Sequence, residues 1–408
     1  MKYVVVLGDG MADYPVAELG HKTPLQAANK PAIDALARRG QLGLVKTVPT
    51  GMAPGSDTAN LSVLGYNPEI YYSGRSPFEA ASMGVSLADS DVAFRCNLVT
   101  LSEADSYGER VVLDHSADEI SSAEAHVLMA EVGRQFGSEN IRFYPGISYR
   151  HLMVWQDGPV DWQLTPPHDI LGQKVGAYLP QGSGGALVAE MMKKSAEFLS
   201  GHEINRRRTA RGLRPANSVW IWGEGKMPQL TGFSEKYGVS GAVISAVDLI
   251  KGIGICAGLK VIEVEGATGN LNTNFRGKAE AALQALADGL DFVYIHIEAP
   301  DECGHRQEVN NKVKAIELID SLVVKTLVEG LDRQGDDYSI LVLPDHATPL
   351  SVRTHTMDPV PFLIYRKHSE RDCPQQTYDE AAAADAGFFH GEGYTLMDLF
   401  LRSGKQGA

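Results

Sequence analysis

Cysteine is scarce in this chain, and it has neither long hydrophobic runs nor an excess of basic residues. The 408 residues include four cysteines without CxxC spacing, which indicates reduced thiols in a cytosolic protein rather than a disulfide framework. A net charge of -14 disfavours a nucleic-acid or anionic-membrane binder. No apolar run approaches the roughly 20 residues of a membrane span. The short run that opens the chain ends at Gly8 and Asp9, too early for a signal peptide, so we expect a cytoplasmic protein.

A nucleotide-cradling loop is also missing, because the pattern GxxxxGK[ST] does not occur. The composition is otherwise that of a large globular protein, with 44% hydrophobic and 22% charged residues. This length favours two domains over one. A local cluster of Arg and His could still hold a small anionic substrate against the negative net charge. The sequence carries no signal for an oligomeric state.

Three short apolar runs each end just before an aspartate: residues 3–7 before Asp9, 291–297 before Asp301, and 339–343 before Asp345. Continuous apolar runs of this length predict central strands covered on both faces. The fold that we expect is therefore α/β, with a mostly parallel central sheet. Open α/β sheets carry their chemistry at the carboxyl ends of the strands, so the three carboxylates should meet there.

The pattern changes between residues 86 and 215. There the order is strand, strand, helix, strand, strand, which predicts a small inserted α+β domain. Residues 1–85 and 216–408 would then form one split core, which includes a strand at residues 218–222. We expect the substrate to bind in a cleft between core and insertion, with the insertion serving as a lid.

Histidines accompany these aspartates. His305 lies four residues after Asp301, His346 directly follows Asp345, and His355 lies in the next loop. A lone Asp-x-x-x-His would more often be a helix start with an exposed histidine. Three strand-end carboxylates with three imidazoles exceed the needs of helix capping, and they could supply ligands for two adjacent divalent cations.

Ser56 stands at the start of a predicted helix, after Gly55. Backbone N–H groups at such a position favour an anion, although a plain N-cap serine is the commoner role. A cation-bound Ser56 would be a strong nucleophile for phosphoryl transfer.

Basic residues offer candidates for binding carboxylate or phosphate. Bidentate arginine suits both groups, and the candidate substrate-binding residues are Arg75, Arg95, Arg150 and His151. A run of five arginines at residues 206–214 reads either as a solvated helix face or as a surface facing a phosphorylated substrate.

Six motifs carry a resemblance to a known family: GDGMAD (8–13), PGSDTANLSVLGY (54–66), GRSPFEAA (74–81), APDECGH (299–305), LPDHATP (343–349) and RTHTMDPVPF (353–362). In this order they resemble the alkaline phosphatase superfamily, and more narrowly its archaeal-type, cofactor-independent phosphoglycerate mutases. The resemblance implies an alkaline-phosphatase-like core and interconversion of 2- and 3-phosphoglycerate through a phosphoserine.

The same resemblance implies two ligand sets. Ser56 falls on the nucleophile. One cation would bind Asp9, Ser56, Asp345 and His346, and the other Asp301, His305 and His355. Mn²⁺ is the expected ion, with Zn²⁺, Co²⁺ and Mg²⁺ also compatible with these ligands. His390 competes with His355 as third ligand of the second set, and we prefer His355 for its motif.

Other roles rest on shorter matches. Residues 235–237 (EKY) resemble the segment with the active-site lysine of larger mutases, so Lys236 would neutralise the phosphoryl group in flight; an exposed helix lysine is the alternative. His115, His151 and His168 are candidates for a general acid or base in the insertion.

The sequence leaves open which molecule accepts the phosphoryl group. Asn60 stands where archaeal mutases more often have histidine, and residues 220–223 (WIWG) are unusually aromatic. Both features resemble a bacterial branch proposed as homoserine kinases, which makes a phosphotransferase to homoserine the second hypothesis. A metal-dependent phosphomonoesterase on the same site is the third.

Overall fold

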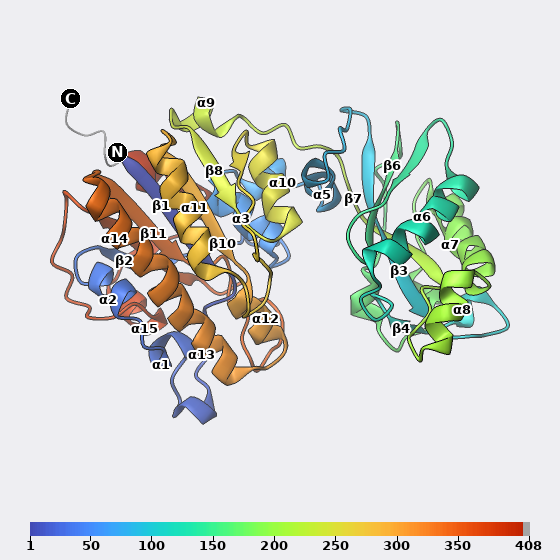
Figure 1. Ribbon diagram of the computed structural model, residues 1–408, viewed down its shortest axis with the longest axis horizontal. Coiled ribbons are helices and arrows are strands. Elements are labelled where there is room, and N and C mark those ends of the chain that lie inside the picture. Colours follow the sequence, from blue (N-terminus) through green and yellow to red (C-terminus); the bar gives the residue numbers. More distant parts are fainter. Residues whose placement is uncertain (403–408) are drawn as a thin grey trace. The chain divides into compact units, whose positions relative to one another are not determined.

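The computed structural model describes residues 1–402, and the chain divides into two compact units (Figure 1). The first unit combines residues 1–72 with the chain from residue 229 onward, and the second comprises Ser73–Pro228. Both boundaries differ from those expected. Helix α5 (Ser76–Ser82) and strand β7 (Ser218–Gly225), which we assigned to the core, belong to the second unit, because both pack against its strand β3 (Val92–Leu101).

An eight-stranded sheet forms the centre of the first unit, in the order β13-β2-β12-β11-β1-β10-β8-β9. Its strands are β1 (Lys2–Gly8), β2 (Gln41–Val45), β8 (Gly241–Ile244), β9 (Lys260–Val261), β10 (Phe292–Ile297), β11 (Tyr338–Leu343), β12 (Val360–Arg366) and β13 (Phe389–His390). Only β12 runs antiparallel to its two neighbours. The predicted α/β fold with a mostly parallel sheet is confirmed.

The register of β1 aligns the three predicted strand ends. Leu7 pairs with Leu343 of β11, and Gly8 pairs with Ile297 of β10. The residues that follow these strands therefore emerge at one edge of the sheet.

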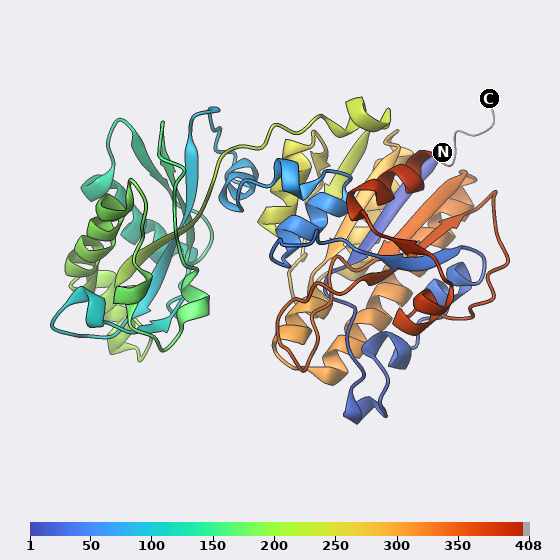
Figure 2. The same cartoon turned by 180° about the vertical axis from the view of Figure 1, so that it is seen from behind.

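Helices cover both faces of this sheet, which explains the continuous apolar strands. The helices are α1 (Pro24–Ala27), α2 (Pro31–Ala37), α3 (Ser56–Val63), α4 (Pro68–Tyr71), α9 (Phe233–Tyr237), α10 (Asp248–Cys256), α11 (Phe275–Ala287), α12 (Ala299–His305), α13 (Val309–Leu318), α14 (Lys325–Gln334), α15 (Glu380–Asp385) and α16 (Leu396–Arg402). Helices α11 and α14 lie over the face seen in Figure 1. On the face seen in Figure 2, α16 packs against β1 through a Tyr3–Phe400 ring contact.

The helical run from Val309 to Gln334 contains a π-helical turn, Ile319–Val324. The wider turn brings Asp320 to the start of α2, where its carboxylate accepts a hydrogen bond from the Ile33 N–H at 2.7 Å. A hydrophobic period of 3.6 does not distinguish such a turn from regular helix.

The second unit contains a five-stranded antiparallel sheet with its own core. Its strand order is β4-β3-β6-β5, with β7 paired to β3. Besides β3, β7 and α5, the unit contains the strands β4 (Val112–Asp114), β5 (Ile141–Tyr144) and β6 (Arg150–Trp155) and the helices α6 (Ser122–Phe136), α7 (Gly185–Ser200) and α8 (Glu203–Ala210). The expected α+β organisation is present, with β7 added. Across residues 1–402, the longest apolar helical stretches fall short of what crossing a bilayer requires.

Candidate active site

The edge of the first sheet gathers the predicted ligands into two overlapping groups. Asp9 follows β1 and Asp345 and His346 follow β11; their ligand atoms all lie within 4.8 Å of one another. His346 belongs equally to a second group with Asp301 of α12 and His355, within the same limit. The two groups therefore share one imidazole, whereas we expected His346 in a single set.

Ser56 lies beside the shared histidine. Its Oγ is 3.2 Å from His346 Nε2. Ser56 is the first residue of α3, and Gly55 occupies the N-cap position, so the serine hydroxyl does not cap the helix. The side-chain amide of Asn60 donates to the Ser56 carbonyl oxygen at 2.9 Å one turn later. The helix thus presents Ser56 among the ligand atoms.

His305 lies beside two members of the second group. Its Nε2 is 3.2 Å from Asp301 Oδ2 and 3.0 Å from His355 Nε2. His355 also lies 3.4 Å from the other oxygen of Asp301, and its Nδ1 bonds to the Pro54 carbonyl at 3.1 Å. This last contact ties the histidine loop to the loop that carries Ser56.

The electrostatics of the edge are those of a cation site. Burial, followed by the charges of Asp345 and Asp301, raises the pKa of Asp9 well above its usual range. Burial alone would do the same to Asp301, but its bonds to His305 and His355 hold its pKa well below the usual range. Burial lowers the pKa of His305, but the Asp301 carboxylate outweighs burial and raises this pKa to about 9.

These residues fit divalent cations. Asp9 Oδ1 is buried and has no hydrogen-bond partner among residues 1–402, while its Oδ2 lies 3.0 Å from His296 Nε2. A bound cation would satisfy the orphaned oxygen and offset the clustered carboxylates. Mixed carboxylate and imidazole donors suit Mn²⁺, Zn²⁺ and Co²⁺.

Three supporting residues escaped the sequence analysis. Besides His296, they include Thr348, whose hydroxyl reaches both ligand groups, and Tyr294, whose hydroxyl donates to Asn60 Oδ1 at 2.7 Å. Asn60 Nδ2 in turn donates to Asp345 Oδ2 at 2.8 Å. The signal for His296 and Tyr294 was their place in the apolar run 291–297, where a polar side chain needs a partner.

Comparisons with known proteins identify the family. A family model described as 2,3-bisphosphoglycerate-independent phosphoglycerate mutase matches residues 37–205. A relative from Geobacter sulfurreducens, named as a probable mutase of this kind, is 51% identical over 98% of this chain and 100% of its own length. A mutase with the same name from Methanosarcina mazei is 49% identical over 99% of this chain and 100% of its own length. This chain belongs to the 2,3-bisphosphoglycerate-independent phosphoglycerate mutase family.

Structural similarity agrees with this assignment. The cofactor-independent phosphoglycerate mutase of Thermoplasma acidophilum aligns with a TM-score of 0.65 at 27% identity, over 99% of this chain and all of that one. The protein is thus an enzyme of the isomerase class, like the mutases it resembles along its whole length.

The second unit of this mutase-family chain gathers the predicted arginines around Glu79. Arg75 Nε lies 2.8 Å from Glu79 Oε1, and Arg95 forms an ion pair with the same oxygen. Burial raises the pKa of Glu79, but the charges of Arg95, Arg75 and Arg150 outweigh burial and hold this pKa below its usual value. Three cations around one carboxylate leave a local excess of positive charge. Arg95 Nε is buried and has no hydrogen-bond partner in the described part of the chain.

Burial lowers the pKa of the three candidate histidines of this unit. His151 is buried beside Arg95 and Arg150, and burial lowers its pKa to about 3. Its Nδ1 accepts the Gly146 N–H at 3.0 Å, while Nε2 has no hydrogen-bond partner within residues 1–402. His115 and His168 lie 6.0 Å apart between ring centres, and burial lowers the pKa of each.

Lys236 does not join the site. It lies in α9, where its Nζ donates to the Gly65 carbonyl and sits 4.8 Å from the ring centre of Tyr66. Gly65 follows the C-terminal end of α3, whereas Ser56 begins that helix, about 13 Å away at 1.5 Å per residue. This placement does not support the predicted role of Lys236 at the phosphoryl group, which stays a prediction.

Two other predictions resolve plainly. His390 bonds to Thr395 Oγ1 at 2.8 Å from β13, so His355, and not His390, reaches the ligand groups. The five arginines at residues 206–214 each pair with an acidic residue: Arg206 and Arg207 with Glu203, Arg208 and Arg211 with Glu124, and Arg214 with Asp114 and Asp118. The solvated-face interpretation holds for four of the five arginines, whereas Arg208 is buried.

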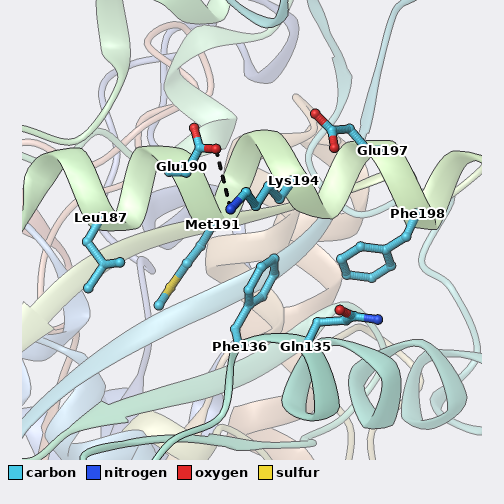
Figure 3. A pocket seen from close by; sticks show the side chains of 8 residues that line it. All are labelled: Gln135, Phe136, Leu187, Glu190, Met191, Lys194, Glu197 and Phe198. Atoms are coloured by element: carbon cyan, nitrogen blue, oxygen red, sulfur yellow. Dashed lines mark ion pairs between the residues drawn. The ribbon is translucent and has the colours of Figure 1, made fainter.

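Figure 3 shows a pocket of the second unit between α6 and α7, with a volume of about 600 Å³. The rings of Phe136 and Phe198 face each other at 5.7 Å, and Lys194 pairs with Glu190 at the rim. Its lining contains none of the predicted catalytic or substrate residues.

Proposed function

We propose that this enzyme interconverts 2- and 3-phosphoglycerate without 2,3-bisphosphoglycerate, through a phosphoserine at Ser56. The observation that carries the proposal is the position of Ser56 Oγ, 3.2 Å from the histidine shared by the two ligand groups. The names of the full-length relatives support phosphoglycerate as the substrate.

Two divalent cations, Mn²⁺ first among them, would be held by Asp9, Asp345 and His346 and by Asp301, His305 and His355. When bound, they supply positive charge that lowers the pKa of the Ser56 hydroxyl and stabilises the phosphoryl oxygens in the transition state.

Ser56 carries the phosphoryl group between the two hydroxyls of glycerate. Its Oγ attacks phosphorus in line, the bond from phosphorus to the substrate's 3-oxygen breaks, and that oxygen gains the proton that Ser56 loses. The 2-oxygen of the same glycerate then attacks phospho-Ser56 and loses its own proton, which returns to Ser56 Oγ. No water enters the balance, so exclusion of water separates a mutase from a phosphatase.

Arg75, Arg95, Arg150 and His151 are the proposed contacts for the substrate's anionic groups. Their support is the excess positive charge around Glu79 and the unpartnered Arg95 Nε and His151 Nε2, which offer donors to carboxylate or phosphate oxygens. The second unit would serve as the lid, and a cytoplasmic location stays a prediction.

Trapping of the intermediate tests this function. Metal-loaded protein mixed with 3-phosphoglycerate and quenched in acid should carry one phosphoryl group, and peptide mapping by mass spectrometry should place it on Ser56. Ser56→Ala should carry none while it still binds cations. A phosphoryl group on another residue, or none in the wild type under turnover, would contradict the proposal.

A further inference from the structure

Thr348 lies between the two ligand groups and contacts a member of each. Its side chain is fully buried. The Oγ1 atom is 2.5 Å from Asp301 Oδ1 and 3.2 Å from His346 Nδ1. Asp301 belongs to one group, and His346 belongs to both.

The single proton of the hydroxyl fixes the direction of both bonds. Thr348 Oγ1 donates to the Asp301 carboxylate, so toward His346 it can act only as an acceptor. The Nδ1 of His346 then carries the ring proton, and its Nε2 keeps a free lone pair. This Nε2 is the atom that lies 3.2 Å from Ser56 Oγ and 3.4 Å from Asp345 Oδ2. Thr348 thereby selects the tautomer in which His346 can bind a cation.

The position of Thr348 is set by packing on its other sides. Its carbonyl oxygen accepts from Lys312 Nζ at 2.8 Å, and its N–H donates to the Ala12 carbonyl at 3.3 Å. A Cβ added at Gly10 would lie 2.6 Å from Thr348 Oγ1, and one at Gly304 would lie 2.5 Å from its carbonyl oxygen. The backbone of Thr348 is thus held in place by the fold, which puts its hydroxyl within reach of both ligands.

We infer that Thr348 is a positioning residue that couples the two cation positions, so that filling one favours filling the other. The inference rests on the two-cation site of the proposed function. With a cation bound, the His346 ring would be ordered, the ring would order the Thr348 hydroxyl, and the hydroxyl would orient Asp301 toward the second cation. Coupling in the reverse direction must be equal.

The test is a direct titration of metal-free protein with Mn²⁺. Calorimetry measures the heat of binding, and electron paramagnetic resonance measures the free Mn²⁺. Wild type should bind two ions with positive coupling. Thr348→Val, which keeps the shape but removes the hydroxyl, should bind Mn²⁺ about 10- to 100-fold more weakly and lose the coupling. Thr348→Ser should stay close to wild type.

Thr100→Val is the matched control. Thr100 is also buried, and its hydroxyl donates to the Pro215 carbonyl in the second unit at 2.8 Å, so its loss should leave Mn²⁺ binding unchanged. Thr348→Ala serves as a second hydroxyl-free variant if the valine variant unfolds. Wild-type affinity and coupling in a folded hydroxyl-free variant would overturn the inference. A wild type that binds two ions but forms no phosphoserine would overturn the proposed function instead.

Discussion

A buried ion pair braces the loops that carry the ligands. Lys312 Nζ of α13 lies 2.7 Å from Asp13 Oδ2, and both side chains are essentially inaccessible to solvent. Asp13 also accepts from the Leu350 N–H, and Lys312 donates to the Thr348 carbonyl. The pair therefore joins the loop after β1, the loop after β11 and helix α13.

Removal of one partner should be costly. Lys312→Met would leave the Asp13 charge buried and uncompensated, so we expect the free energy of unfolding to fall by roughly 3–5 kcal/mol. Urea denaturation of the metal-free protein measures this change. The double variant Lys312→Met with Asp13→Asn should recover part of the loss; a single variant within 1 kcal/mol of wild type, on the order of a surface pair, would contradict the role.

At the scale of single residues, the sequence predicted which residues belong to the site better than it predicted their contacts. Asp9, Asp301 and Asp345 were predictable because each follows an apolar strand, and parallel strands end at one edge. The role of Lys236 stays a prediction, because a three-residue match does not specify which surface its helix presents. Thr348 had no local signal, since its role comes from contacts with Asp301 and His346 that only the fold creates.

For helices and strands, too, the sequence predicted the element better than its partner in the fold. Residues 218–222 were correctly expected to form a strand, yet β7 pairs with β3 in the second unit. An apolar strand fits the core of either sheet, so pattern alone could not select its partner. The π-helical turn Ile319–Val324 was missed for a similar reason, because its sequence keeps a helical hydrophobic pattern.

Helix α15 begins with a partly buried carboxyl whose titration should be visible in stability. Glu380 Oε1 accepts the Asp13 N–H at 3.0 Å, Oε2 accepts the Thr23 hydroxyl at 2.7 Å, and burial raises the pKa of Glu380 to about 7 from 4.5. The folded state therefore binds more protons than the unfolded state between these values. The contribution of this group is present below pH 4.5 and is lost as pH rises through 7.

Glu380→Gln should remove this pH dependence. Relative to wild type, the variant should gain up to roughly 3 kcal/mol of stability between pH 5 and pH 8, as the wild-type carboxyl ionises in its partly buried site. Urea denaturation at both pH values gives the difference. A variant whose stability tracks that of wild type across this range would show that Glu380 titrates normally.

The whole molecule consists of two units with separate cores, and the chain enters and leaves the second unit at adjacent points. Ser73 donates to the Lys226 carbonyl, and a Cβ at Gly74 would lie 1.8 Å from the Glu224 carbonyl oxygen. Terminal segments that meet in this way are typical of a domain that can fold independently.

Residues 73–228 expressed alone should therefore fold. We expect a cooperative thermal transition and dispersed amide resonances, because the antiparallel sheet and its core lie within this segment. A fragment with the spectrum of an unfolded chain would contradict the independence of the unit.

The central claim is that Ser56 passes a phosphoryl group between two hydroxyls of one glycerate. It is tested most directly with Mn²⁺-loaded protein and 3-phosphoglycerate alone, then with homoserine and ATP, with products identified by phosphorus NMR after removal of the metal. The account predicts 2-phosphoglycerate without added 2,3-bisphosphoglycerate, and none from Ser56→Ala. Unchanged 3-phosphoglycerate together with phosphohomoserine, or free phosphate as the sole product, would contradict it.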